Sequence, residues 1–123
     1  MDIDKLLYEC IGASMQVYNH LGPGLLEKIY EKALTYELQQ RGLKVGTQVP
    51  VDIKYRGVVL DTDLRLDLIV EDELIIELKS AEDLVPVHFK QLRTYMKLLD
   101  KSAGLLINFN VADFSNGYKV LKS

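Results

Sequence analysis

Two short segments of the chain decide its fold: DLRLD at residues 63–67 and IIELK at residues 75–79. Apolar and polar residues alternate in both segments, which is typical of strands that bury one face of a sheet. The face predicted to lie toward the core carries the aliphatic residues at every second position: Leu64, Leu66, Leu68, Leu74, Ile76 and Leu78. The face predicted to point away carries mostly charged residues: Asp63, Arg65, Asp67, Ile75, Glu77 and Lys79. One sheet face is therefore expected to gather several carboxylates and a lysine.

The loop between the two strands decides whether Asp67 lies opposite Glu77. A two-residue loop, residues 71–72, would place Asp67 opposite Ile76, whereas a three-residue loop, residues 71–73, would place it opposite Glu77. Two carboxylates directly opposite each other destabilise a sheet. A bound divalent cation would reverse that effect, because hard cations take carboxylate oxygens as ligands. The alternative is that these charges form only a solvated outer face of the sheet.

The rest of the chain is predicted to place helices around these strands. Apolar residues recur at helical spacing in residues 7–21, 26–38 and 92–99, and Pro86 can open the third helix. Strand patterns cover residues 49–55, 58–60, 64–70, 74–78 and 104–109, with a last edge strand expected at 117–121. The third helix lies between two strands, which favours a crossover and a mixed sheet. The predicted class is α/β, a mixed central sheet flanked by helices in the order α-α-β-β-β-β-α-β.

Length and composition restrict the class of protein. A chain of 123 residues is the size of one domain, so residues 1–123 are expected to form a single domain. No apolar run approaches the roughly 18 residues needed to cross a bilayer, and the N-terminus has no signal-peptide pattern, so a cytoplasmic protein is expected. The single Cys10 excludes an intrachain disulfide and is expected in the core. The 15 basic and 18 acidic residues give a net charge of −3, so bulk charge does not predict nucleic-acid binding.

Residues 24–30, GLLEKIY, resemble the signature of the GxxExxY proteins, a bacterial and archaeal group placed in the PD-(D/E)XK nuclease superfamily. The resemblance extends over nearly the whole chain and includes Asp67, the triplet Glu77-Leu78-Lys79, residues 86–91 and residues 104–109. Leu66 stands where the superfamily has a proline, at a position that varies widely. Residues 91–95, QLRTY, are similar to the QxxxY element of RecB-type nucleases, and Glu27 matches the glutamate of that pattern. The resemblance implies a PD-(D/E)XK nuclease-like, RecB-like fold.

The resemblance also implies a metal-dependent nuclease that hydrolyses phosphodiester bonds in nucleic acid, expected to be DNA. Asp67, Glu77 and the backbone carbonyl of Leu78 are expected to hold Mg²⁺ or Mn²⁺. Glu27 is expected as a direct or water-mediated ligand. Such an ion would polarise the scissile phosphate and lower the pKa of a bound water. Lys79 is expected to orient that water or to stabilise charge on the phosphate.

Two further residues are assigned to catalysis on the helix that follows Pro86. Gln91 and Tyr95 lie one helical turn apart and face the same way. Gln91 would steady Lys79 or a phosphate, and Tyr95 would stack or bond nearby unless it is a half-buried core tyrosine. A second stripe on this helix is basic and is either a solvated face or a surface that follows phosphates: Lys90, Arg93, Lys97 and Lys101.

Two other functions compete with the nuclease. The chain could be a non-catalytic module that keeps the nuclease fold and binds nucleic acid or a protein. It could also be an accessory subunit that needs a protein partner or a homodimer to engage substrate, which the small size and the net charge of −3 favour. The complete set of Asp67, Glu77 and Lys79 favours the enzyme.

Overall fold

A five-stranded mixed sheet forms the centre of the computed structural model, which describes all residues from 1 to 123. Its strands lie in the order β1 (Val45–Pro50), β4 (Arg65–Val70), β5 (Leu74–Lys79), β6 (Ala103–Asn108) and β7 (Tyr118–Lys122). All neighbours pair antiparallel except β5 and β6, which are parallel. A parallel pair needs a crossover connection, and helix α3 (Pro86–Leu98) supplies it. The predicted α/β class with a mixed central sheet is confirmed.

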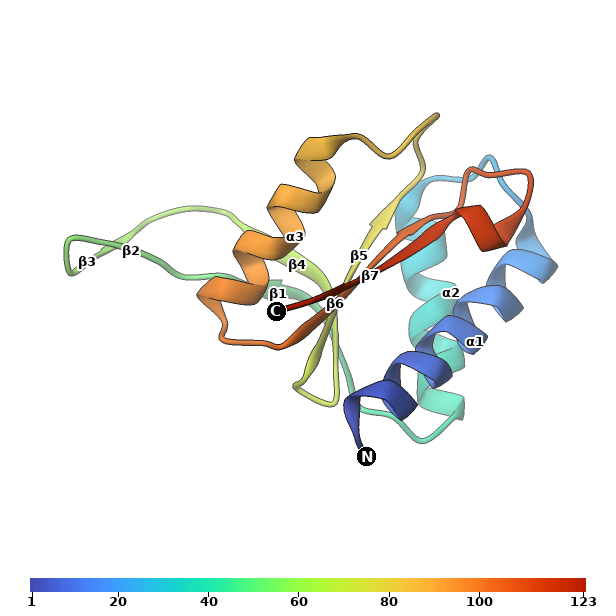
Figure 1. Cartoon of the computed structure of the whole chain (residues 1–123), viewed down its shortest axis with the longest axis horizontal. Coiled ribbons are helices and arrows are strands. Elements are labelled where there is room, and N and C mark those ends of the chain that lie inside the picture. Colours follow the sequence, from blue (N-terminus) through green and yellow to red (C-terminus); the bar gives the residue numbers. More distant parts are fainter.

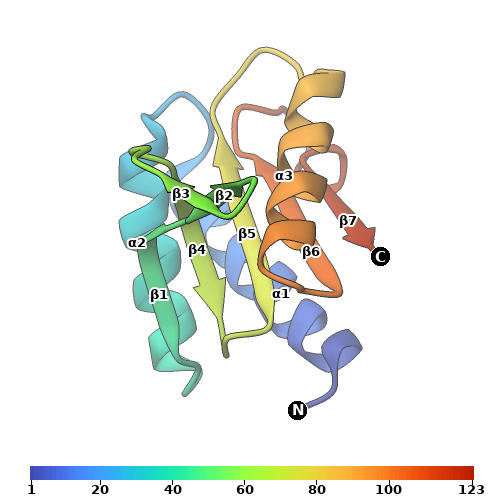
Figure 2. The ribbon, with the colours of Figure 1, turned by 90° about the vertical axis from the view of Figure 1, so that its left-hand side faces the viewer.

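Two helices cover one face of the sheet and the third covers the other (Figure 1, Figure 2). α1 (Ile3–Leu21) starts where the Asp2 side chain accepts a hydrogen bond from the backbone N–H of Lys5 at 2.8 Å. α2 (Glu27–Gln40) packs beside α1, and α3 lies alone on the opposite face. A short 3₁₀ helix, η1 (Phe114–Asn116), precedes β7. None of the helices combines the length and the apolar character that crossing a membrane requires.

The two faces of the sheet carry separate hydrophobic cores. The core under α1 and α2 contains Leu74, Ile76 and Leu78 of β5, as the alternation predicts. The core under α3 contains Ile75, which has no exposed surface, and Glu77 on the same strand is only 4% exposed. The prediction that Ile75 and Glu77 point away from the core is therefore wrong, because α3 covers the face that was expected to be solvated.

Strands β1 and β4 change face at one position, which the alternation did not predict. Leu66 packs in the core under α3, whereas Leu68 packs in the core under α1 and α2. The prediction that both share one face is therefore wrong. The register of β1 on β4 is the same before and after the change, and only the pair Gln48 and Asp67 is missing from the ladder. Gln48 has a φ of 49°, in the left-handed region. The side chains of both strands therefore exchange faces of the sheet at this residue, and neither strand contains an extra residue.

The connection between β4 and β5 has the register that a shared site requires. Val70 pairs with Leu74, which leaves the three-residue turn 71–73. The last paired residues in the other direction are Leu68 and Ile76, so the next step along both strands places Asp67 opposite Glu77. The register predicted for a three-residue loop is confirmed.

Strands β2 (Ile53–Tyr55) and β3 (Val58–Leu60) form a separate two-stranded ribbon that extends away from the sheet (Figure 1). The strand predicted over residues 49–55 is therefore interrupted. The physical reason is that Pro50 cannot donate to a ladder, and the next residue, Val51, turns into the core under α3. A turn at Arg56-Gly57 joins the two strands, with φ values of 52° and 82°.

Gly117 is expected to tolerate no side chain. A Cβ atom there would lie 2.6 Å from the backbone oxygen of Asn108 and 2.9 Å from a methyl group of Val111. We therefore expect Gly117→Ala to lower the free energy of unfolding by about 1–3 kcal/mol in urea titrations. Gly12→Ala is the matched control, because its Cβ would meet only the guanidinium end of Arg41 at 3.2 Å. Helix propensity favours alanine by up to about 1 kcal/mol, so this variant should be unchanged or more stable. Equal losses in both variants would contradict the packing argument.

Candidate functional site

The adjoining ends of β4 and β5 bring the two predicted acidic residues together. The backbone N–H of Asp67 donates to Glu77 Oε2 at 2.8 Å, and the backbone N–H of Leu78 donates to Asp67 Oδ2 at 2.8 Å. Each carboxyl group thus binds the backbone of the opposite strand beyond the last ladder pair. This exchange fixes both side chains and leaves one oxygen of each without a backbone donor.

Glu77 is a buried carboxyl group with a displaced protonation equilibrium. Burial, followed by the charge of Asp67, raises the pKa of Glu77 from 4.5 to about 8. The hydrogen bond from the Asp67 backbone and the charge of Lys79 oppose this shift only in part. Near neutral pH the metal-free site therefore keeps a proton on Glu77. A cation beside the carboxylate would favour the ionised form and lower the pKa.

The start of α2 is tied to the end of β5. Glu27 Oε2 accepts a hydrogen bond from the backbone N–H of Ser80 at 3.3 Å, and the Ser80 hydroxyl donates to the Leu25 carbonyl at 2.6 Å. The Tyr30 hydroxyl donates to the Gly22 carbonyl at 2.6 Å and accepts from the Leu25 N–H at 3.1 Å. The loop before α2 is thus held on both sides. These bonds bring Glu27 to the site although it is distant in the sequence.

An open pocket of about 390 Å³ is lined by residues of α2, β1, β4 and β5. Three of the four predicted metal ligands line it: Glu27, Asp67 and Leu78. The other lining residues were not predicted: Lys28, Glu31 and Gln48. The remaining predicted ligand, Glu77, does not line the pocket and is joined to it through its bond with Asp67.

Glu31 and Gln48 are, with Lys28, the pocket residues that sequence reasoning missed. Glu31 lies one helical turn after Glu27, so the helical spacing could have indicated it. The Gln48 amide nitrogen donates to Glu31 Oε1 and lies 3.5 Å from Asp67 Oδ1. No sequence signal marks Gln48, because its importance comes from a left-handed backbone conformation that glutamine does not favour.

Helix α3 places a polar chain against Lys79. Lys79 Nζ donates to Gln91 Oε1 at 3.3 Å, and Gln91 Nε2 donates to the Tyr95 hydroxyl at 3.0 Å. Burial, followed by the charge of Glu77, raises the pKa of the Tyr95 hydroxyl, so the phenol stays neutral. No carboxylate lies within ion-pair distance of Lys79. The ammonium group is therefore oriented by an amide and is free to bind an anion.

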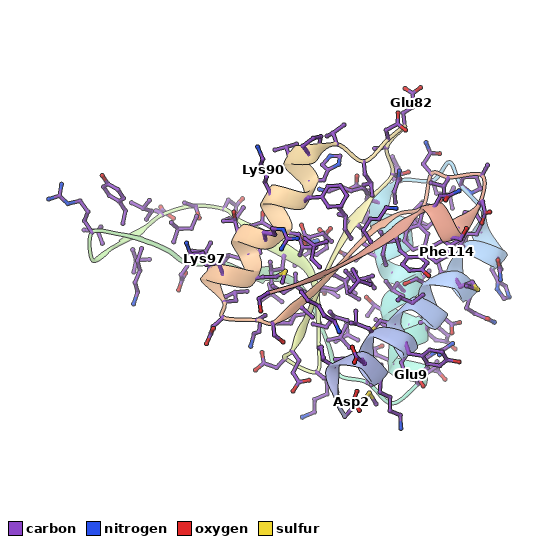
Figure 3. All side chains as sticks on the ribbon, in the orientation of Figure 1. Asp2, Glu9, Glu82, Lys90, Lys97 and Phe114 are labelled. Atoms are coloured by element: carbon purple, nitrogen blue, oxygen red, sulfur yellow. The ribbon has the colours of Figure 1, made fainter.

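The basic stripe of α3 is shorter than predicted. The helix ends at Leu98, so Lys101 lies beyond it and pairs with Asp72 at 3.6 Å. The other three cations are exposed on the helix and have no acidic partner: Lys90, Arg93 and Lys97. Figure 3 shows Lys90 and Lys97 on the side of α3 away from the sheet.

The predicted ligands fit a hard divalent cation by their chemistry. They offer only oxygen atoms, from the carboxyl groups of Glu27, Asp67 and Glu77 and from the Leu78 carbonyl, and these are the donors that Mg²⁺ takes. Burial, followed by the charge of Asp67, raises the pKa of Glu77, and a cation beside this group would favour its ionised form. No three acidic, histidine or cysteine side chains lie close enough to share one ion, so the donor types match but the cage is not preformed.

A family model described as the PD-(D/E)XK nuclease superfamily matches residues 4–121. The chain belongs to this superfamily. Comparison with curated proteins and comparison with solved structures give no match. The triplet Glu77-Leu78-Lys79 has the (D/E)XK form of the superfamily name, and it lies on the strand that pairs with Asp67's strand. Membership shows the family and agrees with the mixed sheet, whereas the GxxExxY group and the RecB-like subtype stay predictions.

Glu77→Gln is expected to change how stability depends on pH. The pKa of Glu77 is higher in the folded chain than its ordinary value of 4.5, so the unfolded chain releases this proton first as pH rises. The free energy of unfolding should therefore fall between about pH 4.5 and pH 8 through this group. The glutamine variant has no such group to titrate. At pH 8.5 without metal, its free energy of unfolding should equal that of the parent or exceed it by up to roughly 1–2 kcal/mol.

Urea unfolding in EDTA at pH 5 and pH 8.5 measures this difference. Glu73→Gln, in the exposed turn between β4 and β5, is the matched control and should change stability by less than about 0.5 kcal/mol at either pH. A loss of more than about 2 kcal/mol for Glu77→Gln at pH 8.5 would show that the carboxylate supports the fold instead.

Proposed function

We propose that this chain is a nuclease that hydrolyses phosphodiester bonds in nucleic acid with the help of Mg²⁺ or Mn²⁺. The observation that carries the proposal is the exchange of hydrogen bonds between Asp67 and Glu77, with Lys79 two residues further along β5. This places an acidic pair and an oriented cation at one end of two adjacent strands, in a chain of the PD-(D/E)XK nuclease superfamily.

The proposed metal ligands are Asp67, Glu77 and the carbonyl oxygen of Leu78, with Glu27 as a direct or water-mediated fourth. An ion bound there would supply Lewis-acid stabilisation of the phosphate and a more acidic bound water. Ionised Glu77 is the form that binds a cation, so metal binding should release the proton that the metal-free site retains. Gln48 links the two acidic groups of the pocket, because its amide donates to Glu31 and lies 3.5 Å from Asp67 Oδ1.

The proposed role of Lys79 is to orient the attacking water or to stabilise charge that develops on the phosphate. Gln91 and Tyr95 act as positioning residues, because the hydrogen-bonded chain from Tyr95 through Gln91 holds the ammonium group. A neutral Tyr95 hydroxyl can donate a hydrogen bond of its own while it accepts the one from Gln91.

A non-catalytic binding module is the second candidate, and one observation favours it. No three acidic side chains gather at metal-binding spacing. A site of this kind could bind nucleic acid or a protein without cleaving a bond. The two candidates differ in whether divalent metal binds, so calorimetric titration with Mg²⁺ and Mn²⁺ is the first measurement.

We also propose that the chain falls in the GxxExxY group, because each signature residue has a distinct structural role. Gly24 has a φ of 101°, which favours glycine. Glu27 lines the pocket with Asp67, and the Tyr30 hydroxyl fixes the loop that precedes Glu27. For the RecB-like subtype, the support is the contact between Gln91 and Lys79.

Cleavage should depend on the acidic pair and on Lys79. We expect Asp67→Asn, Glu77→Gln and Lys79→Met each to lower the rate at least about 100-fold with Mg²⁺ or Mn²⁺, measured on single- and double-stranded DNA and RNA. The two amide variants should also lose the rise in melting temperature that metal gives the parent. Asp63→Asn is the control, because this acidic side chain is 96% exposed and lies outside the pocket. A parent that binds nucleic acid but neither binds metal nor cleaves would establish the binding module.

Nucleic acid is proposed to lie along the outer side of α3, with DNA as the expected substrate. This helix has no acidic residue, and three cations on it lack acidic partners: Lys90, Arg93 and Lys97. Gln91 contacts Lys79 from the side of the same helix that faces the sheet, so nucleic acid bound to the cations would reach the site by passing around α3. Counterion release makes such contacts dependent on salt.

Replacing Lys90, Arg93 and Lys97 together with alanine should weaken DNA binding in EDTA. The slope of log affinity against log salt should also become shallower by about 2–3, because each lost phosphate contact lowers it by about one. The control variant replaces three other exposed lysines on different elements, Lys5, Lys32 and Lys119. Fluorescence anisotropy at several salt concentrations measures both quantities. Equal slopes for the two variants would contradict the proposed path.

A further inference from the structure

The β2–β3 ribbon, residues 53–60, has one face made only of apolar side chains. The pairs Ile53 with Leu60 and Tyr55 with Val58 lie on the same face, since residues two apart on a strand share a side. Tyr55 is 62% exposed, Val58 61% and Leu60 41%, and Ile53 is partly exposed. The other face carries the pair formed by Lys54 and Val59. An open, one-sided apolar face of this kind is typical of an interaction surface.

The ribbon is held at its base and has no cover within the chain. The backbone N–H of Val51 donates to the Leu64 carbonyl at 2.9 Å, and both side chains pack in the core under α3. Beyond this anchor the ribbon projects from the rest of the molecule (Figure 1). A two-stranded hairpin is at best marginally stable in water unless its apolar face is covered. A partner that covers the face would therefore also stabilise the ribbon.

The charges of the ribbon differ between its two ends. The turn at the tip carries Arg56, and Lys54 lies in the middle of β2; neither pairs with an acidic residue. The base carries exposed Asp52 and Asp61, which also lack a basic partner, and Asp63 follows. The ribbon is therefore positive at one end and negative at the other. Two such ribbons attract each other when they lie head to tail.

We propose that the apolar face of the ribbon binds the same face of a second copy of this chain, with the two ribbons head to tail about a two-fold axis. Each Tyr55 and Val58 pair would then cover the Ile53 and Leu60 pair of the second copy. The basic tip of one ribbon would lie above the acidic base of the other. Nucleic acid is a poorer occupant, because this face offers no cation to a phosphate backbone.

The size of the face sets the strength of the association. A fully exposed apolar side chain of this size has roughly 150–200 Å² of accessible surface. Covering the exposed parts of the four apolar side chains would therefore bury on the order of 300–400 Å² per copy. A stable interface buries about 800 Å² per partner, so the ribbon supports a weak dimer with a dissociation constant of about 10 µM to 1 mM. Packed sheets lie about 10 Å apart, close to the Debye length, so the charges align the ribbons and add little affinity.

Sedimentation equilibrium of the full chain tests the proposal with two neighbouring substitutions. Val58→Gln and Val59→Gln replace valines of similar exposure, 61% and 55%, on opposite faces of the ribbon. We expect the first to raise the dissociation constant by more than about 10-fold and the second to change it by less than about threefold. Both should keep the melting temperature of the parent, because the ribbon lies outside both cores.

Three results would overturn the proposal. A parent chain that is monomeric at about 0.5 mM would show that the ribbon does not bind a second copy. A dimer that Val58→Gln leaves unchanged would place the interface elsewhere. A monomer whose Val58→Gln variant loses affinity for DNA would assign the ribbon to nucleic acid.

A charge exchange tests the head-to-tail alignment. Arg56→Glu alone and Asp61→Arg alone should each weaken the dimer a few-fold in about 0.05 M salt, because each places like charges at both ends of the pair. The double variant restores opposite charges and should recover the affinity of the parent. In about 0.5 M salt the charges are screened, so the parent, both single variants and the double variant should dimerise with similar affinity. A double variant as weak as the single variants would show that the ribbons do not lie head to tail.

Discussion

The pairing of β4 with β5 is the constraint on which the rest of the structure depends. The three-residue turn at 71–73 sets a register in which Asp67 and Glu77 meet, and two hydrogen bonds from backbone N–H groups then hold their carboxyl groups. Bringing two carboxyl groups together in a buried position costs free energy, and the raised pKa of Glu77 is the visible sign of that cost. A register shifted by one residue would separate the pair and reverse the faces of the strand.

Elements from both sides of the sheet converge on this pairing. From one side, the loop before α2 is tied to Ser80 directly after β5, which brings in Glu27. From the other side, α3 covers Glu77 and orients Lys79 through Gln91. The site is thus built at the end of a strand whose two faces are both buried. The site therefore differs from a cluster of charges on the surface. Glu77 is shielded from water, while the pocket beside Asp67 is open to it.

The parallel neighbour of β5 completes the arrangement. Asn108, at the end of β6, is 2% exposed, and its side chain bonds both the backbone N–H and the carbonyl of Ala81. The chain that leaves β5 is therefore fixed before it crosses to α3. A polar side chain buried so fully with its hydrogen bonds satisfied positions a loop rather than filling a core.

The sequence by itself determined the α/β class and the mixed sheet, because hydrophobic period and a helix between two strands are local or nearly local properties. It left the register of Asp67 open between a two-residue and a three-residue loop, and the pairing of Val70 with Leu74 in the structure placed Asp67 opposite Glu77. It also gave Lys79 or a phosphate as the partner of Gln91, and the structure shows the contact with Lys79. Tertiary structure alone decided that Glu77 is buried, since alternation gives two faces of a strand and does not say that α3 covers the second. The change of face at Gln48 was equally hidden, because a left-handed residue without glycine leaves no mark in the sequence. The ribbon separated from the sheet because Val51 packs under α3, a contact that only the assembled cores create.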